Sequence, residues 1–279
     1  MSEAWERRAA REAARRALDE DLAGYGDLAG AVFSADVRAH VVARETGVLS
    51  GRLAFEETAR LVDEGVDVRF TRADGERFAT GDVLARVAGP GASVLALERT
   101  GLNFLGRLSG VATTTARFVA ETEGTKARIA ATRKTTPGLR ALEKLAVVHG
   151  GGLPHRFGLF DAAMIKDNHV RAAGGVGAAV AAVRGALGHV HGIEVEVDDL
   201  DQLDEALSVG ATVVLLDNMD LDEVRAAVAR VAGRGLVEVS GGVTLDRVRD
   251  LATTGVDVIS AGALTTRSAW IDIALDLEA

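Results

Sequence analysis

Three segments between residues 132 and 169 decide how this chain is interpreted: Thr132-Arg133-Lys134-Thr135-Thr136-Pro137-Gly138-Leu139-Arg140, Gly150-Gly151-Gly152-Leu153-Pro154-His155-Arg156 and Lys166-Asp167-Asn168-His169. Residues 132–169 carry six Lys or Arg against three Asp or Glu, a net charge of +3, whereas the whole chain carries −9. Several of these cations follow apolar runs or glycine turns, where a charge that serves only solubility is less expected. The pattern favours a site for a small, multiply charged anion over a solvated basic face.

Around these segments, short β-rich runs alternate with helical patterns. The runs are 128–132, 162–166, 193–197, 212–216, 236–240 and 256–260, and the clearest helical patterns are 139–148, 200–208, 221–231 and 245–252. This alternation predicts a parallel sheet, either doubly wound or closed into a barrel. Polar or small residues stand at the carboxyl ends of many of these strands, as in barrel enzymes. No glycine-rich nucleotide-binding loop follows the first strand, which argues against a doubly wound sheet. The sequence therefore predicts an α/β barrel in which six strands are recognised.

The first hundred residues follow another pattern. Residues 4–22 and 55–65 predict helices, residues 94–121 predict a long one, and short strands separated by turn signals fall within 37–51 and 66–89. This part of the chain is predicted to form a small mixed domain with mostly antiparallel strands.

Composition excludes several kinds of protein. The 279 residues include 48% hydrophobic and 26% charged residues, as in an ordinary globular protein, and no cysteine, which rules out disulfides, thiolate catalysis and cysteine zinc sites. No apolar run approaches the ~20 residues that span a bilayer, and the charged start, Met1 to Arg8, has no apolar signal core. We therefore expect a cytoplasmic protein without membrane contact. Its net acidity also argues against general nucleic-acid binding.

Acidic residues mark two neighbouring strands. Alternation in 193–198 places Glu194, Glu196 and Asp198 on one face, which is costly in a covered parallel sheet unless the carboxylates are paired with cations or bind a metal. These two readings are compatible. Asp217 ends an apolar run and is either a helix cap or a ligand. Together, Glu196 and Asp217 could hold Mg²⁺ through oxygen ligands and waters.

Two small-residue turns follow the last two strands. Ser240-Gly241-Gly242 and Ala261-Gly262-Ala263 each lie between a strand and a helix, an arrangement with which barrels bind phosphate. Lys134 and Lys166 at strand ends could form Schiff bases, as in barrel aldolases, but the surrounding cations fit dianion binding better. His155 and Arg156 are predicted to contact the same ligand.

At these residues the sequence resembles the quinolinate phosphoribosyltransferases, also known as carboxylating nicotinate-nucleotide pyrophosphorylases. Besides the segments quoted above, the resemblance rests on Glu98-Arg99-Thr100, on 107–113, on Glu194-Val195-Glu196-Val197-Asp198, on Leu216-Asp217-Asn218, and on 240–242 and 262–265. It covers essentially the whole chain in the family's order.

The resemblance implies an N-terminal α+β open sandwich domain, 1–110, followed by an incomplete, six- to seven-stranded TIM-like α/β barrel, 111–266. A C-terminal helix, 267–279, would pack with the first domain. It further implies a homodimer in which one subunit's N-terminal domain caps its partner's barrel. The reaction would join quinolinate to phosphoribosyl pyrophosphate (PRPP) with Mg²⁺, giving nicotinate mononucleotide, pyrophosphate and CO₂, a step of de novo NAD biosynthesis.

The resemblance also implies roles for individual residues, by position. Quinolinate would be bound by Thr132, Arg133, Lys134, His155, Arg156 and Lys166, with Arg99 contributed across the dimer interface. Glu196 and Asp217 would hold the Mg²⁺ of PRPP, and the turns Ser240-Gly241-Gly242 and Ala261-Gly262-Ala263 would bind its 5′-phosphate. Lys134, Lys166, Glu196 and Asp217 would be the catalytic residues.

Three positions depart from the family pattern. Ala131 stands where an Asp is expected, Leu153-Pro154 replaces Val-Asn, and Leu145 replaces Tyr. These changes affect fine contacts to the substrate and leave the charged set intact. Two other functions remain open: a relative with retuned specificity, such as the homologues associated with molybdenum transport, and a Schiff-base aldolase that uses Lys166. A Rossmann-like phosphoribosyltransferase is disfavoured, because Asp198-Asp199 lacks that class's apolar run and following loop.

Overall fold

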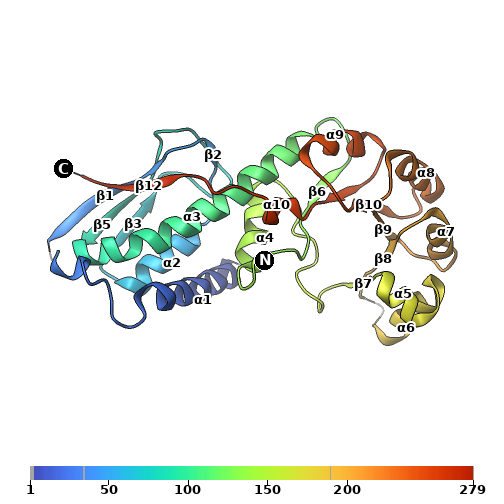
Figure 1. Cartoon of the computed structure of the whole chain (residues 1–279), viewed down its shortest axis with the longest axis horizontal. Helices are drawn as coiled ribbons and strands as arrows, with labels where there is room; N and C mark the ends of the chain where they lie inside the picture. The colour runs from blue at the N-terminus through green and yellow to red at the C-terminus, as the bar shows by residue number, and fades with distance from the viewer. Residues whose placement is uncertain (1–2, 34, 189, 279) are drawn as a thin grey trace. The chain divides into compact units, whose positions relative to one another are not determined.

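Figure 1 shows the computed structural model of the chain, which describes residues 3–33, 35–188 and 190–278. The chain divides into two compact units, Met1–Ala116 with Thr135–Gly151 and Arg267–Ala279, and Arg117–Lys134 with Gly152–Thr266. The predicted boundary at residue 110 falls inside the long helix α3 (Gly91–Ala120), and the segment 135–151 belongs to the first unit. Among the described residues, no helix is both long and apolar enough to span a membrane.

The first unit contains an antiparallel sheet with strand order β12-β1-β5-β3. Its strands are β1 (Asp36–Ala43), β3 (Asp67–Phe70), β5 (Val83–Pro90) and β12 (Ile273–Leu277), beside a small pair, β2 (Gly47–Val48) and β4 (Arg77–Phe78). Its helices are α1 (Glu3–Leu22), η1 (Gly30–Val32), α2 (Arg52–Val62), α3 and α4 (Arg140–His149). Alternate residues of β1, Val41 among them, share a buried core with Phe55 of α2 and Leu97 of α3. One face of the sheet is therefore covered by helices, as in an open sandwich.

Helix α4 belongs to the first unit through a close helix contact. It ends at Gly150, where a Cβ would overlap the carbonyl oxygen of Ala112 on α3. Only glycine allows the backbones to approach so closely. Gly150, the first residue of the run Gly150-Gly151-Gly152, thus allows α4 to pack closely against α3.

The C-terminal segment is a strand, so the predicted helix at 267–279 is wrong. Strand β12 pairs antiparallel with β1, with Ile273 opposite Ala43 and Leu277 opposite Ala39. The physical reason is the period of the pattern: Ile271, Ile273, Leu275 and Leu277 alternate with Asp, Ala and Asp, and the first three of them pack on the core of the first unit. A period of two suits a half-buried strand and not a helix.

The second unit is a six-stranded sheet whose recorded pairings are parallel, with order β6-β11-β10-β9-β8-β7. The strands are β6 (Arg128–Ala130), β7 (Ala163–Ile165), β8 (Ile193–Val197), β9 (Val213–Asp217), β10 (Leu236–Ser240) and β11 (Val258–Ser260). The helices are α5 (Asp167–Ala173), α6 (Val176–Ala186), α7 (Leu200–Ser208), α8 (Leu221–Val231), α9 (Leu245–Thr253) and α10 (Ala263–Thr266). The first strand pairs with the last, as in a barrel, while β6 and β7 are the two edges within the described residues. The predicted α/β fold class is confirmed.

The two faces of the central strands β8, β9 and β10 differ. One face carries the buried Val195, Val214 and Val237. We call the opposite face the inner face; it carries Glu194 and Glu196 of β8, Asp217 of β9, and Glu238 and Ser240 of β10. Parallel strands are usually apolar on both faces, so a polar inner face indicates a site rather than a core.

Candidate active site

Nine of the predicted site residues line one pocket of about 350 Å³ in the second unit. They are Thr132, Arg133, Lys134, His155, Arg156, Lys166, Glu196, Asp217 and Ser240. Asp217 and Ser240 are the last residues of their strands, Lys166 directly follows β7, Glu196 is the last residue but one of β8, and 132–134 lie in the loop after β6. Parallel strands bring their carboxyl ends to one edge, so residues more than a hundred positions apart meet there.

Lys166 links this edge to helix α5. It is the N-cap residue, and its backbone N–H donates to Nδ1 of His169 at 2.9 Å. Its Nζ forms an ion pair with Glu196, whose side chain is buried. The carboxylate face of β8 is therefore paired with cations, as one of the two sequence interpretations expected.

Lys134 is held by its backbone. Its N–H donates to Oγ1 of Thr132 at 3.0 Å, and its carbonyl accepts from Oγ1 of Thr265 at 2.5 Å. A Cβ at Gly262 would lie 2.9 Å from Cδ of Lys134, so the small residue leaves room for the lysine side chain. The exposed Lys134 is thus anchored at its main chain while its ammonium stays available to a ligand.

The two guanidinium groups of the pocket repel each other. Arg156 is half-buried and donates to the carbonyl of Ala162 at 3.4 Å and to Sδ of Met164 at 3.3 Å. Burial first, and then the charge of Arg133, lower the pKa of Arg156. An anion bound beside both guanidiniums would relieve that repulsion.

His155 lies against two buried carboxylates. Its Nε2 is 3.2 Å from Oε1 of Glu238 and 3.6 Å from Oε2 of Glu194. Burial opposes a charge on the ring, but hydrogen bonds and the fields of Glu194 and Glu238 outweigh it and raise the pKa of His155 to about 9. Burial also raises the pKa of Glu194. Among the described residues, these three are the His, Asp and Glu side chains whose potential ligand atoms cluster within 4.8 Å of one another.

The predicted magnesium acids come from neighbouring strands. Leu215 of β9 pairs with Glu196 of β8, which places Asp217 two residues further along toward the carboxyl edge. Asp217 is not the cap of the next helix, because Asp220 caps α8 and accepts from the N–H groups of Asp222 and Glu223. Both carboxylates line the pocket. Two hard oxygen donors beside space for phosphate oxygens and water fit the needs of Mg²⁺.

The two predicted phosphate turns are shaped by close approaches. Gly241 and Gly242 have φ of +86° and +56°, and a Cβ on Gly241 would overlap Oδ1 of Asn218. Of the small residues in these turns, Ser240 lines the pocket, whereas Gly241, Gly242, Ala261, Gly262 and Ala263 are not among its lining residues. The two turns therefore remain predicted phosphate sites.

Arg99 and the three departures from the family pattern remain to be placed in the structure. Arg99 is exposed on α3, and it does not line the pocket. Of the three departures from the family pattern, Ala131 is a buried part of the lining and Leu145 is buried in α4. Pro154 precedes His155, which has a positive φ of 53°.

The sequence interpretation missed five lining residues, namely Ala131 as a contact, Met164, Leu215, Glu238 and Ser260. Of these, Glu238 had a usable signal. It is an acid between two valines in the strand Leu236–Ser240, just as Glu196 stands between Val195 and Val197 in its strand. The others are apolar or small residues, and their residue types alone do not indicate a role in binding or catalysis.

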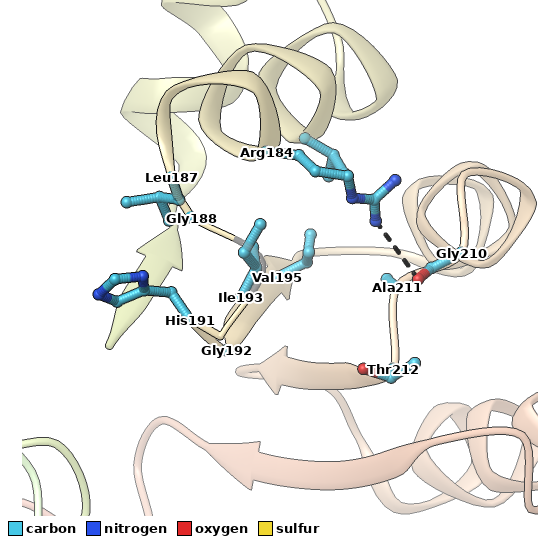
Figure 2. A pocket seen from close by; sticks show the side chains of 11 residues that line it. Arg184, Leu187, Gly188, His191, Gly192, Ile193, Val195, Gly210, Ala211 and Thr212 are labelled. Carbon is cyan, nitrogen blue, oxygen red and sulfur yellow. Dashed lines mark hydrogen bonds between the residues drawn. The ribbon is translucent and has the colours of Figure 1, made fainter. Parts of the chain in front are cut away.

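A second pocket, of about 390 Å³, lies between α6 and the segments that lead into β8 and β9 (Figure 2). Arg184 of α6 donates to the carbonyl of Gly210 at 3.4 Å and to that of Val209 at 3.0 Å. No residue of the predicted site lines this pocket, and no Asp or Glu does. It lies toward the amino ends of the strands, away from the edge that barrel enzymes use.

A barrel-like parallel sheet with acids and cations converging at its carboxyl edge defines an α/β enzyme that binds anionic substrates. The comparisons with known proteins agree. The model of the quinolinate phosphoribosyl transferase N-terminal domain matches residues 27–109, and that of the C-terminal domain matches residues 111–276. The chain therefore belongs to the quinolinate phosphoribosyl transferase family.

Several known proteins match this chain along nearly its whole length and nearly their own. A nicotinate-nucleotide pyrophosphorylase [carboxylating] of Mycobacterium leprae is 44% identical, covering 96% of this chain and 97% of the relative. A probable enzyme of that name from Bacillus subtilis is 42% identical over 92% of this chain and 90% of its own length. The solved nicotinate-nucleotide pyrophosphorylase of Francisella tularensis superposes with a TM-score of 0.94 at 35% identity, covering 98% of this chain and 97% of that chain.

Proposed function

We propose that this chain transfers the phosphoribosyl group of PRPP to the ring nitrogen of quinolinate. The C–N bond forms as pyrophosphate leaves, and the loss of one carboxylate as CO₂ gives nicotinate mononucleotide. The observation that carries the proposal is the single pocket that gathers Arg133, Lys134, Arg156 and Lys166 with Glu196 and Asp217. The names of the relatives, including a quinolinate phosphoribosyltransferase [decarboxylating] of Nicotiana tabacum, support it.

The cations hold and orient quinolinate. Its two adjacent carboxylates carry two negative charges, which Arg133 and Arg156 can bind with paired N–H donors. Lys134 and Lys166 add point charges, and Thr132 and His155 stand beside them. Fixing the ring by both carboxylates aligns its nitrogen with the anomeric carbon, and such positioning contributes a large part of the rate of a two-substrate reaction.

The acids and the small-residue turns serve PRPP. Glu196 and Asp217 would hold Mg²⁺, which when bound offsets the charge that develops on the departing pyrophosphate. Lys166, paired with Glu196, places a cation next to the same carboxylate. The turns at 240–242 and 261–263 would offer backbone N–H groups near helix starts to the 5′-phosphate, except for the N–H of Ala261, which donates to the carbonyl of Ala130.

We further propose that the enzyme is a homodimer and that Arg99 of one subunit completes the quinolinate pocket of the other. Arg99 is exposed, and its charge has the sign that the substrate requires. A cytoplasmic location is likewise a proposal, which fractionation of the source cells tests.

The aldolase alternative is less favoured. A Schiff-base lysine must have its amine free to attack the carbonyl, whereas Nζ of Lys166 is engaged in an ion pair with Glu196. A relative with retuned specificity differs from our proposal only in which anionic heterocycle is accepted. Ala131 is the departure that lines the pocket and so bears on that choice.

The test is an assay with purified protein, quinolinate, PRPP and Mg²⁺, which follows nicotinate mononucleotide, pyrophosphate and CO₂. We expect the three products in equal amounts, loss of activity with a chelator, and recovery when Mg²⁺ is restored. Folded protein that binds PRPP but releases no CO₂ from quinolinate would refute the proposal. Borohydride trapping of a carbonyl substrate on Lys166 would instead support the aldolase.

A further inference from the structure

Besides Glu196, the inner face of the sheet carries two further buried carboxylates, Glu194 and Glu238, and Glu238 lines the pocket with the cations. The side chains of Glu238 on β10 and Glu194 on β8 are only 6% and 12% exposed. Negative charge at this depth is costly and repels an anionic ligand, unless a cation offsets it. His155 is the cation-forming group in contact with both.

The carboxylate side holds the ring of His155 in both protonation states. In the neutral ring, Nδ1 accepts from the backbone N–H of Arg156 at 2.7 Å and the hydrogen is on Nε2. In the imidazolium both nitrogens carry hydrogen, so Nδ1 no longer accepts, and the contacts of Nε2 alone hold the ring. Nε2 points to Glu238 and Glu194, as given above. In either protonation state, Nε2–H is therefore the group that faces the two carboxylates.

His155 also occupies a backbone position that needs support. Its φ of 53° is in the left-handed region, which costs a non-glycine residue about 1–3 kcal/mol. The next residue is Arg156, whose guanidinium reaches the pocket. The contacts of the His155 side chain stabilise the turn in this conformation. They thereby also fix the position of the Arg156 backbone, from which its side chain extends.

We infer that Glu238 and Glu194 are positioning residues, which hold His155 through Nε2 and so fix the turn that presents His155 and Arg156 to quinolinate. The inference rests on the proposed function of the pocket and names the part of the site that recognises the pyridine dicarboxylate. Glu238 has the shorter contact and the deeper burial, and is thus the main anchor. Neither carboxylate touches the substrate in this account.

The test compares Glu238→Gln and Glu194→Gln with Glu123→Gln, a control at an exposed acid. Losing the buried ion-pair contact with Nε2 of His155 predicts that Glu238→Gln raises the KM for quinolinate about tenfold or more. The KM for PRPP should stay within about threefold, because Glu196, Asp217 and the glycine turns are unchanged. Glu194→Gln should have the same effect, but a smaller one.

A double-mutant cycle separates positioning from a general structural role. If Glu238 acts through His155, then the quinolinate KM of Glu238→Gln/His155→Gln equals that of His155→Gln alone. In ¹⁵N spectra of the histidine rings, assigned with His155→Gln, the Nε2 signal of His155 should move in Glu238→Gln and stay in the control. Additive penalties, or a wild-type KM and an unmoved signal, would overturn the inference.

The outcome also distinguishes this inference from the proposed function. If wild-type protein turns over quinolinate and Glu238→Gln behaves as the control does, only the positioning role fails. If wild-type protein does not use quinolinate, the proposed function fails first. Should Glu238→Gln not fold, Glu194→Gln and the ¹⁵N spectrum of the wild-type protein, in which Nε2 must be protonated, still decide.

Discussion

At the scale of single residues, the cationic pocket depends on side chains whose charges are balanced by named partners. Lys166 is balanced by Glu196, and His155 by Glu194 and Glu238. Arg133 and Arg156 instead repel each other. Burial first, and then the charge of Arg133, lower the pKa of Arg156. The pocket thus keeps positive charge where a dianion is to bind.

Removing a pocket cation should remove turnover and leave the fold intact. We expect Lys134→Ala and Arg156→Ala each to lower quinolinate turnover by roughly a thousandfold or more, because both oppose substrate charge in a partly desolvated site. Lys126→Ala is the matched control, since its exposed ion pair with Asp257 lies outside the pocket. Steady-state kinetics and thermal unfolding measure the two effects. Full activity in either folded pocket variant would discredit the assignment.

The buried imidazole predicts a pH dependence of stability. The pKa of His155 is raised from 6.5 to about 9 in the folded chain, so the native state binds the extra proton between these values. Its stabilising contribution is fully present below pH 6.5 and is lost as the pH rises toward 9. We expect the difference in unfolding free energy between wild type and His155→Gln to fall by on the order of 1 kcal/mol per pH unit across this window. A constant difference in chemical denaturation would contradict the pairing.

At the scale of elements, sequence patterns predicted the second unit closely. The runs at 193–197 and 236–240, and the helices at 200–208 and 221–231, have the bounds that the structure gives. They could be predicted because the two strands are short and alternating, and because the two helices begin after the capping residues Asp199 and Asp220. The C-terminal strand is wrongly predicted as a helix, although its residues alternate with a period of two. Its partner, β1, is more than two hundred residues away, so the pairing itself could not be predicted from the neighbouring sequence.

The site was less predictable than the fold. Charged residues after strands identified most of the pocket, since such residue types are rare at the ends of buried strands. Glu238 was overlooked, although its alternation matched that of Glu194. The contact between Glu238 and His155 joins residues far apart in sequence, and only the folded sheet brings them together.

The turn after β10 gives an element-scale prediction. In Gly241→Ala a Cβ would meet Asn218 in a backbone with φ of +86°, so the turn must shift. We expect a loss of about 1–3 kcal/mol in stability and a weaker apparent affinity for PRPP. Gly185→Ala in α6, where a Cβ meets nothing within 4 Å, should be neutral or stabilising. An unchanged KM for PRPP in Gly241→Ala would argue against a phosphate site at this turn.

At the scale of the whole molecule, the chain contains both units of the family, with a family model matching each. Among the described residues, all fourteen that line the pocket, nine of them predicted from the sequence, belong to the second unit. Arg99, in the first unit, is the predicted site residue that the proposed dimer must supply.

Mixing two inactive variants tests whether Arg99 of one subunit completes the pocket of the other. Arg99→Ala and Lys134→Ala should each be inactive as homodimers. After exchange of subunits, half of the sites in mixed dimers combine an intact Lys134 with an intact Arg99, so about a quarter of wild-type activity should return. Size-exclusion chromatography confirms the oligomer. No recovery in a mixture shown to have exchanged would exclude Arg99 as a residue of the partner's site.

The most direct measurement of the central claim, that this pocket recognises a dianionic pyridine and joins it to PRPP, is the ratio of kcat/KM for quinolinate to that for nicotinate. Nicotinate lacks the second carboxylate, so the cations opposite that group would be left without a partner. We expect quinolinate to be preferred by at least ~10³-fold, and Arg156→Ala to reduce the ratio. Equal use of nicotinate, or a ratio that Arg156→Ala leaves unchanged, would contradict the account.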